Sequence, residues 1–295
     1  HADKEPTAPA DKEPTAPADK KPTAAERIRG AAKTGIKLGV AVAILAWLFS
    51  RGDLDPDTIK RPLETPGTVL LVLCLGTIGL TMSGVRWWLL LGAVGIRIPV
   101  LAAVRLCWIG HFWNMVIPGA VSGDLVKMFY IGRQVPEARE ESWGTVIADR
   151  LIGLGALVSV STVAALTQLD FIVGRAELRA SFAFMVLILT GFLGLATVLA
   201  LGIGTTWKIT AWIGDRLPFR DSIVRLYSTL RALRKRPGRV LAAYAISVTA
   251  HLVSVSCAYL FGRLFTDALD ISQYYALVPM AFFSNAIPLT PGGIG

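Results

Sequence analysis

The sequence has few of the residues from which most catalytic and metal sites are built. Its 295 residues include three cysteines and three histidines. The cysteines lie far apart within apolar runs and form no C-x-x-C pair, so we interpret them as small hydrophobic residues. His111 and His251 are interpreted as packed polar side chains, because scattered histidines do not make a metal site. We expect no metal and no cofactor.

Other chemical signatures are missing as well. The sequence contains no G-x-x-x-x-G-K-[ST] loop, which excludes an ATP-driven pump built on that motif within these residues. No serine, cysteine or metal constellation has catalytic spacing. Enzymatic activity is therefore uncertain, and transport is the better expectation.

Apolar residues, in contrast, are abundant. They make up 53% of the chain, the mean hydropathy is +0.55, and several apolar runs reach bilayer length. The net charge of +9 comes from Lys and Arg residues placed between these runs, which favours a membrane surface over nucleic acid as the partner. We expect an all-α polytopic protein of the cell membrane, meaning the inner or cytoplasmic membrane.

The sequence predicts a tail and a membrane domain. Residues 1–30 form a polar tail in which the octapeptide A-D-K-E-P-T-A-P begins at Ala2 and again at Ala10. The tail has no apolar face and a proline every few residues, so we expect it to be disordered. Residues 31–295 form the membrane domain. Its expected hydrophobic segments cover residues 35–49, 68–94, 98–117, 143–166, 182–204, 240–265 and a last run that begins near 274.

The distribution of positive charge predicts the topology. Lys and Arg number nine in residues 205–239 but two in 168–180 and one in 263–272. If the segment 98–117 crossed the bilayer, the stretch with nine would lie outside, against the positive-inside rule. We therefore expect residues 99–130 to form a re-entrant hairpin open to the cytoplasm, with a cytoplasmic N-terminus. The alternative is a crossing helix.

A break in the middle of this hairpin carries the candidate site. The run N-M-V-I-P-G-A-V-S-G-D-L-V-K starts at Asn114, and its Pro-Gly pair interrupts the helix. Backbone groups freed by the break must meet protein, water or ligand, and amides at a helix start attract anions such as a lipid phosphate. A plain loop with a satisfied cap is the alternative. The candidate substrate-binding residues here are Asn114, Pro118, Gly119, Ser122, Gly123, Asp124 and Lys127.

A similar pattern recurs at the end of the sequence. Residues 282–295 again contain an aromatic pair, an asparagine, Ile-Pro and glycine. Under the predicted topology this copy re-enters from the opposite face, which is the pattern of an inverted-repeat transporter. The alternative is that the similarity is chance. The candidate site residues of this copy are Asn285, Pro288, Pro291, Gly292 and Gly293.

Charged residues inside apolar segments complete the candidate site. Asp149 and Arg150 lie about two turns into a membrane helix, where charge is costly and usually faces the protein interior. Adjacent residues on a helix do not face each other, so each needs a partner elsewhere. We predict that Arg150 pairs with Asp124, and Asp149 with Arg105 or Lys127. The alternative is an arginine that reaches the interface beside a structurally paired aspartate.

One further cluster near the end of the segment 68–94 combines charge with aromatic side chains. Arg86, Trp87 and Trp88 are consecutive there. Tryptophan and arginine are enriched where a helix meets the membrane interface, so we interpret these residues as interfacial anchors.

Three motifs in order resemble the membrane region of lysylphosphatidylglycerol synthases and of flippase-like proteins. They are the run that starts at Asn114, A-D-R-L-I-G-L at 148–154, and the terminal P-L-T-P-G-G-I-G. The resemblance covers about residues 35–295 and implies lipid handling. In the two-part synthases, a soluble domain attaches lysine to phosphatidylglycerol and the membrane region moves the product across the bilayer.

The sequence departs from this family's pattern at three places. Ser122 stands where the family commonly has glycine, and Lys127 stands where it commonly has arginine. The family's pattern also continues past the terminal glycines, so the resemblance implies that a last membrane segment is absent or truncated in this sequence.

These observations predict a flippase-like integral membrane lipid translocase that moves or binds a phospholipid or a lipid-linked headgroup. Its partners would be membrane lipids with anionic or lipid-linked headgroups, and a homo-oligomer is compatible with the sequence. Two alternatives stay open. One is a membrane enzyme or enzyme subunit acting on polyprenyl-phosphate lipids, and the other is a scaffold that recruits partners through its repetitive tail.

Overall fold

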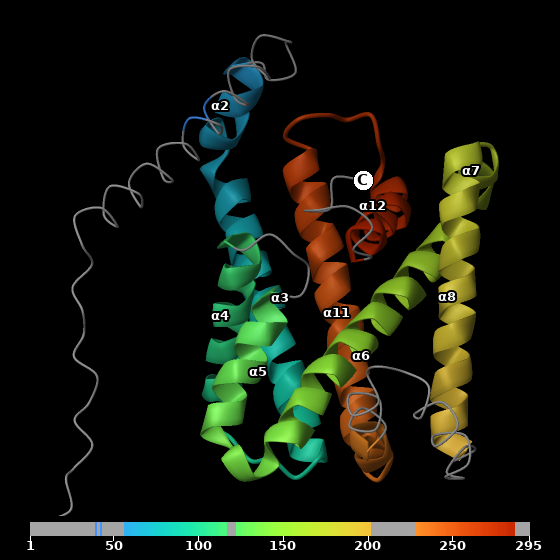
Figure 1. The fold of residues 1–295 in the computed structure, drawn as a ribbon. Coiled ribbons are helices and arrows are strands. Elements are labelled where there is room, and N and C mark those ends of the chain that lie inside the picture. Colours follow the sequence, from blue (N-terminus) through green and yellow to red (C-terminus); the bar gives the residue numbers. More distant parts are fainter. Residues whose placement is uncertain (1–38, 40–41, 43–55, 117–121, 202–227, 287–295) are drawn as a thin grey trace, which may run out of the picture. The chain divides into compact units, whose positions relative to one another are not determined.

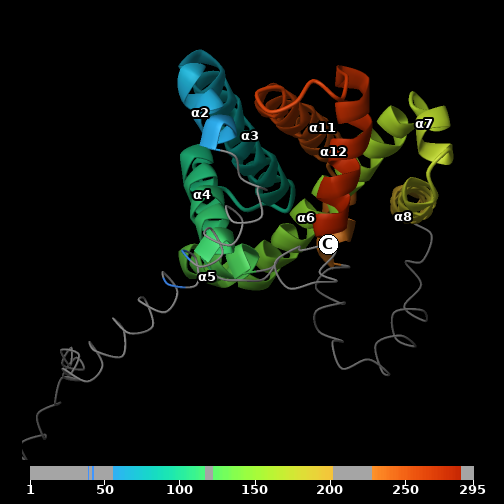
Figure 2. The same cartoon turned by 90° about the horizontal axis from the view of Figure 1, so that it is seen from above.

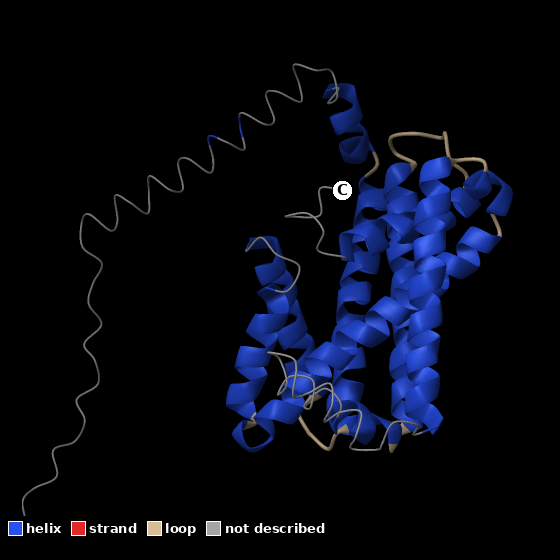
Figure 3. Ribbon diagram, turned by 45° about the vertical axis from the view of Figure 1, so that its right-hand side comes forward, coloured by secondary structure: helices blue, strands red, loops and turns tan. Residues whose placement is uncertain are grey.

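The described part of the chain is built from helices. The computed structural model describes residues 39, 42, 56–116, 122–201 and 228–286, and every regular element in these ranges is helical (Figure 1, Figure 3). The chain divides into two compact units, His1–Ile59 and Lys60–Gly295, and the helices from residue 66 onwards lie in the second. The predicted tail lies outside the described residues, as does nearly all of the first predicted membrane segment.

Short connections join most of the described helices. They are α2 (Pro56–Glu64), α3 (Pro66–Ala93), α4 (Val100–Val116), α5 (Ser122–Gln134), the 3-10 helix η1 (Pro136–Ala138), α6 (Arg139–Leu166), α7 (Leu169–Val173), α8 (Ala176–Leu201), α11 (Pro237–Gly262) and α12 (Ile271–Ala286).

Four helices of the described residues are long and apolar enough to cross a membrane. These are 66–93, 136–166, 178–198 and 237–262, and 100–116 is a shorter apolar helix. They correspond to the predicted segments, so the chain is an all-α polytopic membrane protein.

α6 is the central helix of the second unit. It runs obliquely between the other helices in Figure 1 and contacts α3, α5, α8, α11 and α12. In its most apolar stretch of 18 residues, 61% of the residues are buried, against 6% for α3 and α8. Seen from above, α4 and α5 lie towards one end of the arrangement and α8 towards the other (Figure 2). An apolar helix enclosed in this way holds the bundle together, while α3 and α8 keep apolar faces that suit lipid.

The chain leaves α3 through a left-handed glycine. Gly95 has a φ of 96°, and the N–H of Ile96 donates to the carbonyl of Leu91 at 2.9 Å. This is the Schellman type of helix end, in which Ile96 also packs against Leu91. Trp88 Nε1 donates to the carbonyl of Ile98 at 3.0 Å and holds the turn in place. The turn therefore directs α4 back along α3.

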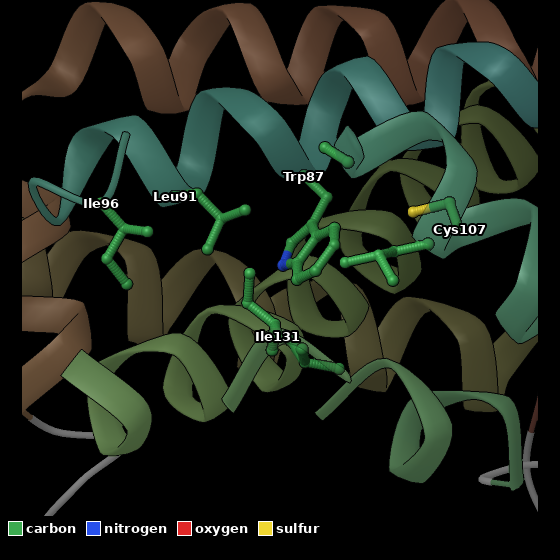
Figure 4. Packing of buried hydrophobic residues seen from close by; sticks show 8 residues of the cluster. Trp87, Leu91, Ile96, Cys107 and Ile131 are labelled. Carbon is green, nitrogen blue, oxygen red and sulfur yellow. The ribbon is translucent and has the colours of Figure 1, made fainter. Parts of the chain in front are cut away.

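α4 and α5 pack against each other as an antiparallel pair. Ile96, just before α4, and Ile131, near the end of α5, belong to one buried cluster with Trp87 and Leu91 of α3 (Figure 4). The chain therefore returns, after α4 and α5, to the end of α3 at which it left.

Glycines bring α4 and α5 into backbone contact. A methyl group at Gly123 would overlap the Gly110 carbonyl, and one at Gly110 would lie 3.0 Å from the Gly123 carbonyl oxygen. After α5, η1 leads into α6, and Trp143 Nε1 donates to the Met128 carbonyl at 2.8 Å. The hairpin is thus fixed both internally and to α6.

The other side of α6 holds α8 and α12. The buried cluster that these three helices share contains Leu157, Val158, Ala165, Met185, Met280 and Phe283. α12 begins with a capping box, because Asp270 Oδ1 accepts from the Gln273 N–H at 2.9 Å and Gln273 Oε1 accepts from the Asp270 N–H at 3.0 Å. The Ser272 hydroxyl and the Gln273 N–H, both donating to the carboxylate, lower the pKa of Asp270. The start of α12 is therefore well defined.

The prediction that Arg86, Trp87 and Trp88 are interfacial anchors is wrong for the first two. Trp87 is fully buried and the Arg86 side chain is only 12% exposed. Both lie on the part of α3 that α4, α5 and α6 cover. Trp88, by contrast, is 37% exposed.

Candidate functional site

Five charged side chains from three helices meet inside the bundle. Arg86 comes from α3, Asp124 and Lys127 come from α5, and Asp149 and Arg150 come from α6. We refer to these five residues as the charge cluster. Charged groups within apolar helices are costly to bury, so they are expected to pair with one another.

The Arg86 guanidinium and the Asp149 carboxylate form a two-point ion pair. Arg86 Nε donates to Asp149 Oδ1 at 2.6 Å and Nη2 donates to Oδ2 at 2.8 Å. Arg86 Nη1 also donates to Ser247 Oγ of α11 at 3.2 Å. Parallel bonds of this kind fix the planar guanidinium as well as its charge. Arg86 therefore ties α3 to both α6 and α11.

A second ion pair joins α5 to α6. Arg150 Nε donates to Asp124 Oδ2. Asp124 lies in the first turn of α5, where the helix dipole favours a negative charge. The two side chains differ in exposure, since Asp124 is 12% exposed and Arg150 is 44% exposed. The pair thus marks the edge of the cluster.

Lys127 lies between the two ion pairs. Its Nζ is 3.6 Å from Asp124 Oδ1 and 3.6 Å from Asp149 Oδ2, and it is 5.1 Å from the centroid of the Trp87 ring. Lys127 is 6% exposed. The cluster holds three cations and two carboxylates, so it carries a net charge of +1. Because each carboxylate already has an arginine, Lys127 supplies the excess charge.

Two glycines make room for the cationic side chains. A methyl group at Gly110 would lie 3.0 Å from Lys127 Cγ and Cδ, and one at Gly153 would lie 3.0 Å from Arg86 Nη1. Both distances are tighter than ordinary van der Waals contact. The glycines therefore allow the lysine and arginine stems to lie flat against neighbouring helices.

A cavity of about 640 Å³ adjoins the cluster. It lies between α3, α4 and α11, and Arg86 forms part of its wall. His111 of α4 and His251 of α11 also line it. Cavities of this size that combine apolar walls with a few polar groups are the usual sites for small ligands.

Comparison with known families identifies the chain. The model of the lysylphosphatidylglycerol synthase TM region matches residues 36–295. The chain belongs to this family. No curated protein and no solved structure matched the chain. Membership makes it an integral membrane protein related to lipid handling, and the resemblance seen in the sequence motifs is confirmed.

Two ion pairs of this family member match the predictions made from the sequence. The pairs Arg150–Asp124 and Lys127–Asp149 are both present. Arg105 is exposed on α4, and the ion pairs seen among the described residues do not include it. The residue that sequence reasoning missed is Arg86. An arginine inside an apolar segment indicates a buried counter-charge, and this signal was available for Arg86. The neighbouring tryptophans instead indicated a position at the membrane interface.

The other residues predicted to bind substrate have a structural role or lie outside the described residues. Asn114 Oδ1 accepts from the Gly123 N–H at 2.6 Å and from Ser122 Oγ at 3.1 Å, so α4 caps the start of α5. This geometry is the satisfied cap that we named as the alternative. Asn285 lies in α12, without a described side chain. The residues outside the described ranges are Pro118, Gly119, Pro288, Pro291, Gly292 and Gly293.

Both histidines are packed polar side chains, as predicted. His111 Nδ1 lies 2.9 Å from the Cys107 carbonyl oxygen, and His251 Nε2 lies 3.0 Å from that of Gly153. Their position on the cavity wall was not predicted, because it depends on how α4 and α11 pack on α3.

Proposed function

We propose that this chain is a flippase-like lipid translocase that brings an anionic headgroup, of a phospholipid or a lipid-linked substrate, to the charge cluster. The observation that carries this proposal is the excess positive charge of Lys127, buried among apolar helices. Intramembrane ionisable residues are costly and generally mark substrate or ion pathways. The headgroup phosphate would pair with the buried ammonium group of Lys127.

A purely structural role explains the two arginine–aspartate pairs better than it explains Lys127. Without Lys127, Arg86–Asp149 and Arg150–Asp124 would form a neutral set that joins three helices. The Lys127 Nζ contacts of 3.6 Å are longer than the 2.6 Å and 2.8 Å bonds of the Arg86 pair. A lysine is a compact point charge on a flexible stem, so it can turn from the carboxylates towards a phosphate.

The dimensions of the hairpin support a re-entrant position. α4 has 17 residues and α5 has 13. At 1.5 Å per residue these arms measure ~25 Å and ~20 Å, less than the ~30 Å hydrocarbon core. We propose that the hairpin enters and leaves on the cytoplasmic side, so that α5 carries Asp124 and Lys127 into the bilayer. A second hairpin beginning with α12 would enter from the opposite face.

The decisive experiment follows a headgroup-labelled phosphatidylglycerol in vesicles that contain the purified protein. We expect the protein to speed exchange between leaflets well above protein-free vesicles. Lys127→Met should reduce this rate roughly tenfold, an effect of about 1.4 kcal/mol, because the excess charge is lost while both arginine pairs remain. Lys127→Arg should retain most of the rate.

Lys235→Met is the matched control, since Lys235 is an exposed lysine outside the cluster. It should leave the rate unchanged. A Lys127→Met protein that folds normally and moves lipid at the wild-type rate would contradict the proposed role of Lys127. Failure of the wild-type protein to exceed protein-free vesicles would contradict translocation itself.

A further inference from the structure

The cavity beside Arg86 is elongated along α3. Its lining on this helix runs from Val72 to Arg86. The 14 steps between these two residues correspond to a rise of ~21 Å at 1.5 Å per residue. Among the residues that the structure describes, Leu73 in the cavity wall is 62% exposed, so the cavity opens sideways onto an apolar surface. A lipid chain can enter it from the bilayer without crossing a polar layer.

The two ends of the cavity differ in polarity. At one end Val72, Leu73 and Gly76 of α3 offer aliphatic or small groups, and at the other end lies Arg86. The Arg86 guanidinium has five N–H donors, of which the bonds to Asp149 and Ser247 use three. An apolar channel that ends at a guanidinium matches an acyl chain followed by a phosphate.

His251 adds a second polar group at the Arg86 end. Its Nε2 lies 3.0 Å from the Gly153 carbonyl oxygen, and because a carbonyl only accepts, this nitrogen carries a hydrogen. The same Gly153 packs against Arg86 Nη1, so both side chains border one stretch of α6. In the neutral ring, Nδ1 is then an acceptor for a headgroup hydroxyl or ammonium group.

We infer that this cavity is a lateral binding site for one phospholipid. Its phosphate contacts Arg86, its headgroup donors reach His251, and an acyl chain lies along α3 towards Val72. The inference rests on the proposed function in naming a phospholipid as the occupant. It adds a position at which this lipid binds beside the charge cluster. Arg86 belongs to both the cavity and the charge cluster, so it links the bound headgroup to the excess charge of Lys127.

Gly76 offers a way to close this cavity without disturbing the fold. It lines the cavity, and a Cβ added there meets no atom within 4 Å. Gly67, also on α3, has the same open surroundings but does not line the cavity. Gly76→Phe therefore fills the site, and Gly67→Phe is its matched control.

The test uses phosphatidylglycerol with a photoreactive diazirine on one acyl chain, in phosphatidylcholine vesicles that contain the full chain. We expect cross-links at residues 72–80 of α3 and 250–257 of α11, mapped by mass spectrometry. Gly76→Phe should lower them roughly tenfold and Gly67→Phe should not. Unlabelled phosphatidylglycerol should compete at roughly tenfold lower concentration than a diacylglycerol with the same chains.

Two results would overturn the inference: cross-links that Gly76→Phe leaves unchanged, or a diacylglycerol that competes as well as phosphatidylglycerol. The cross-links report binding whether or not lipid moves between leaflets. A cavity that labels specifically in vesicles without transport would therefore uphold this site while the proposed translocation fails. Transport without specific labelling would uphold the proposed translocation and overturn this binding site.

Discussion

At the scale of single residues, Asp149 is the most constrained member of the charge cluster. It accepts two bonds from Arg86 and lies 3.6 Å from Lys127 Nζ. Its side chain is 5% exposed. Losing this carboxylate would leave a buried guanidinium without its counter-charge, which costs more than the pair itself contributes.

We therefore expect Asp149→Asn to lower the free energy of unfolding by about 3–5 kcal/mol, measured by equilibrium unfolding in detergent micelles. Asp267→Asn is the control, because its ion pair with Arg263 is largely exposed. Exposed pairs contribute about 1 kcal/mol or less. The double variant Arg86→Gln/Asp149→Asn should recover much of the loss. Equal effects of Asp149→Asn and Asp267→Asn would show that the buried pair is not a structural tie.

The pairing of Asp124 with Arg150, and of Asp149 with Lys127, could be predicted from the sequence because few opposite charges occur inside the apolar segments. Arg86 could not be placed in the same way. Its neighbours Trp87 and Trp88 are typical of the membrane interface, and only the packing of α5 and α6 on α3 shows that this face is interior. The sequence alone does not say which other helix covers a given helix face.

At the scale of elements, the contact between α4 and α5 decides where Asp124 and Lys127 lie. The backbones of the two helices touch at Gly110 and Gly123, and Asn114 closes the hairpin near its tip. Small residues at such crossings allow helices to approach closely in membranes. A larger side chain at either glycine would push α5 away from α4.

Gly123→Leu should accordingly destabilise the protein by about 1–3 kcal/mol, because overpacking of a tight contact forces backbone shifts. Thermal unfolding of the purified protein in detergent measures this effect. Gly194→Leu on α8 is the matched control, since a Cβ at Gly194 meets no atom within 4 Å. Equal melting temperatures for the two variants would mean that the α4–α5 contact is not tight.

The long helices could be predicted from hydropathy, since α3, α6, α8 and α11 each contain an apolar run of bilayer length. The end of α3 is also determined by nearby residues, because Gly95 adopts the left-handed conformation that glycine tolerates. The central position of α6 could not be predicted in this way. It follows from the contacts of α6 with the surrounding helices, which the sequence of α6 alone does not specify.

At the scale of the whole molecule, the membrane topology is a prediction that combines the charge distribution with the antiparallel packing of α4 and α5. The connection between α3 and α4 and the one between α5 and α6 lie at the same end of the second unit, since Ile96 and Ile131 share a cluster. The stretch before α11 contains nine Lys and Arg residues within 205–239, as the positive-inside rule favours for a cytoplasmic side. The opposite inverted-repeat hairpin stays a prediction, because residues beyond Ala286 lie outside the described part.

The proposed path of the headgroup to the charge cluster requires α4 and α5 to return to the membrane face from which they entered. The most direct test replaces Cys74, Cys107 and Cys257, then places single cysteines at three exposed positions, Arg97, Arg133 and Asp267. Each is labelled from either side of the membrane with an impermeant thiol reagent. We predict that Arg97 and Arg133 label only from the cytoplasm, and Asp267 only from outside. If Arg133 labels from the side opposite to Arg97, the hairpin crosses the bilayer and the proposed path to the charge cluster is wrong.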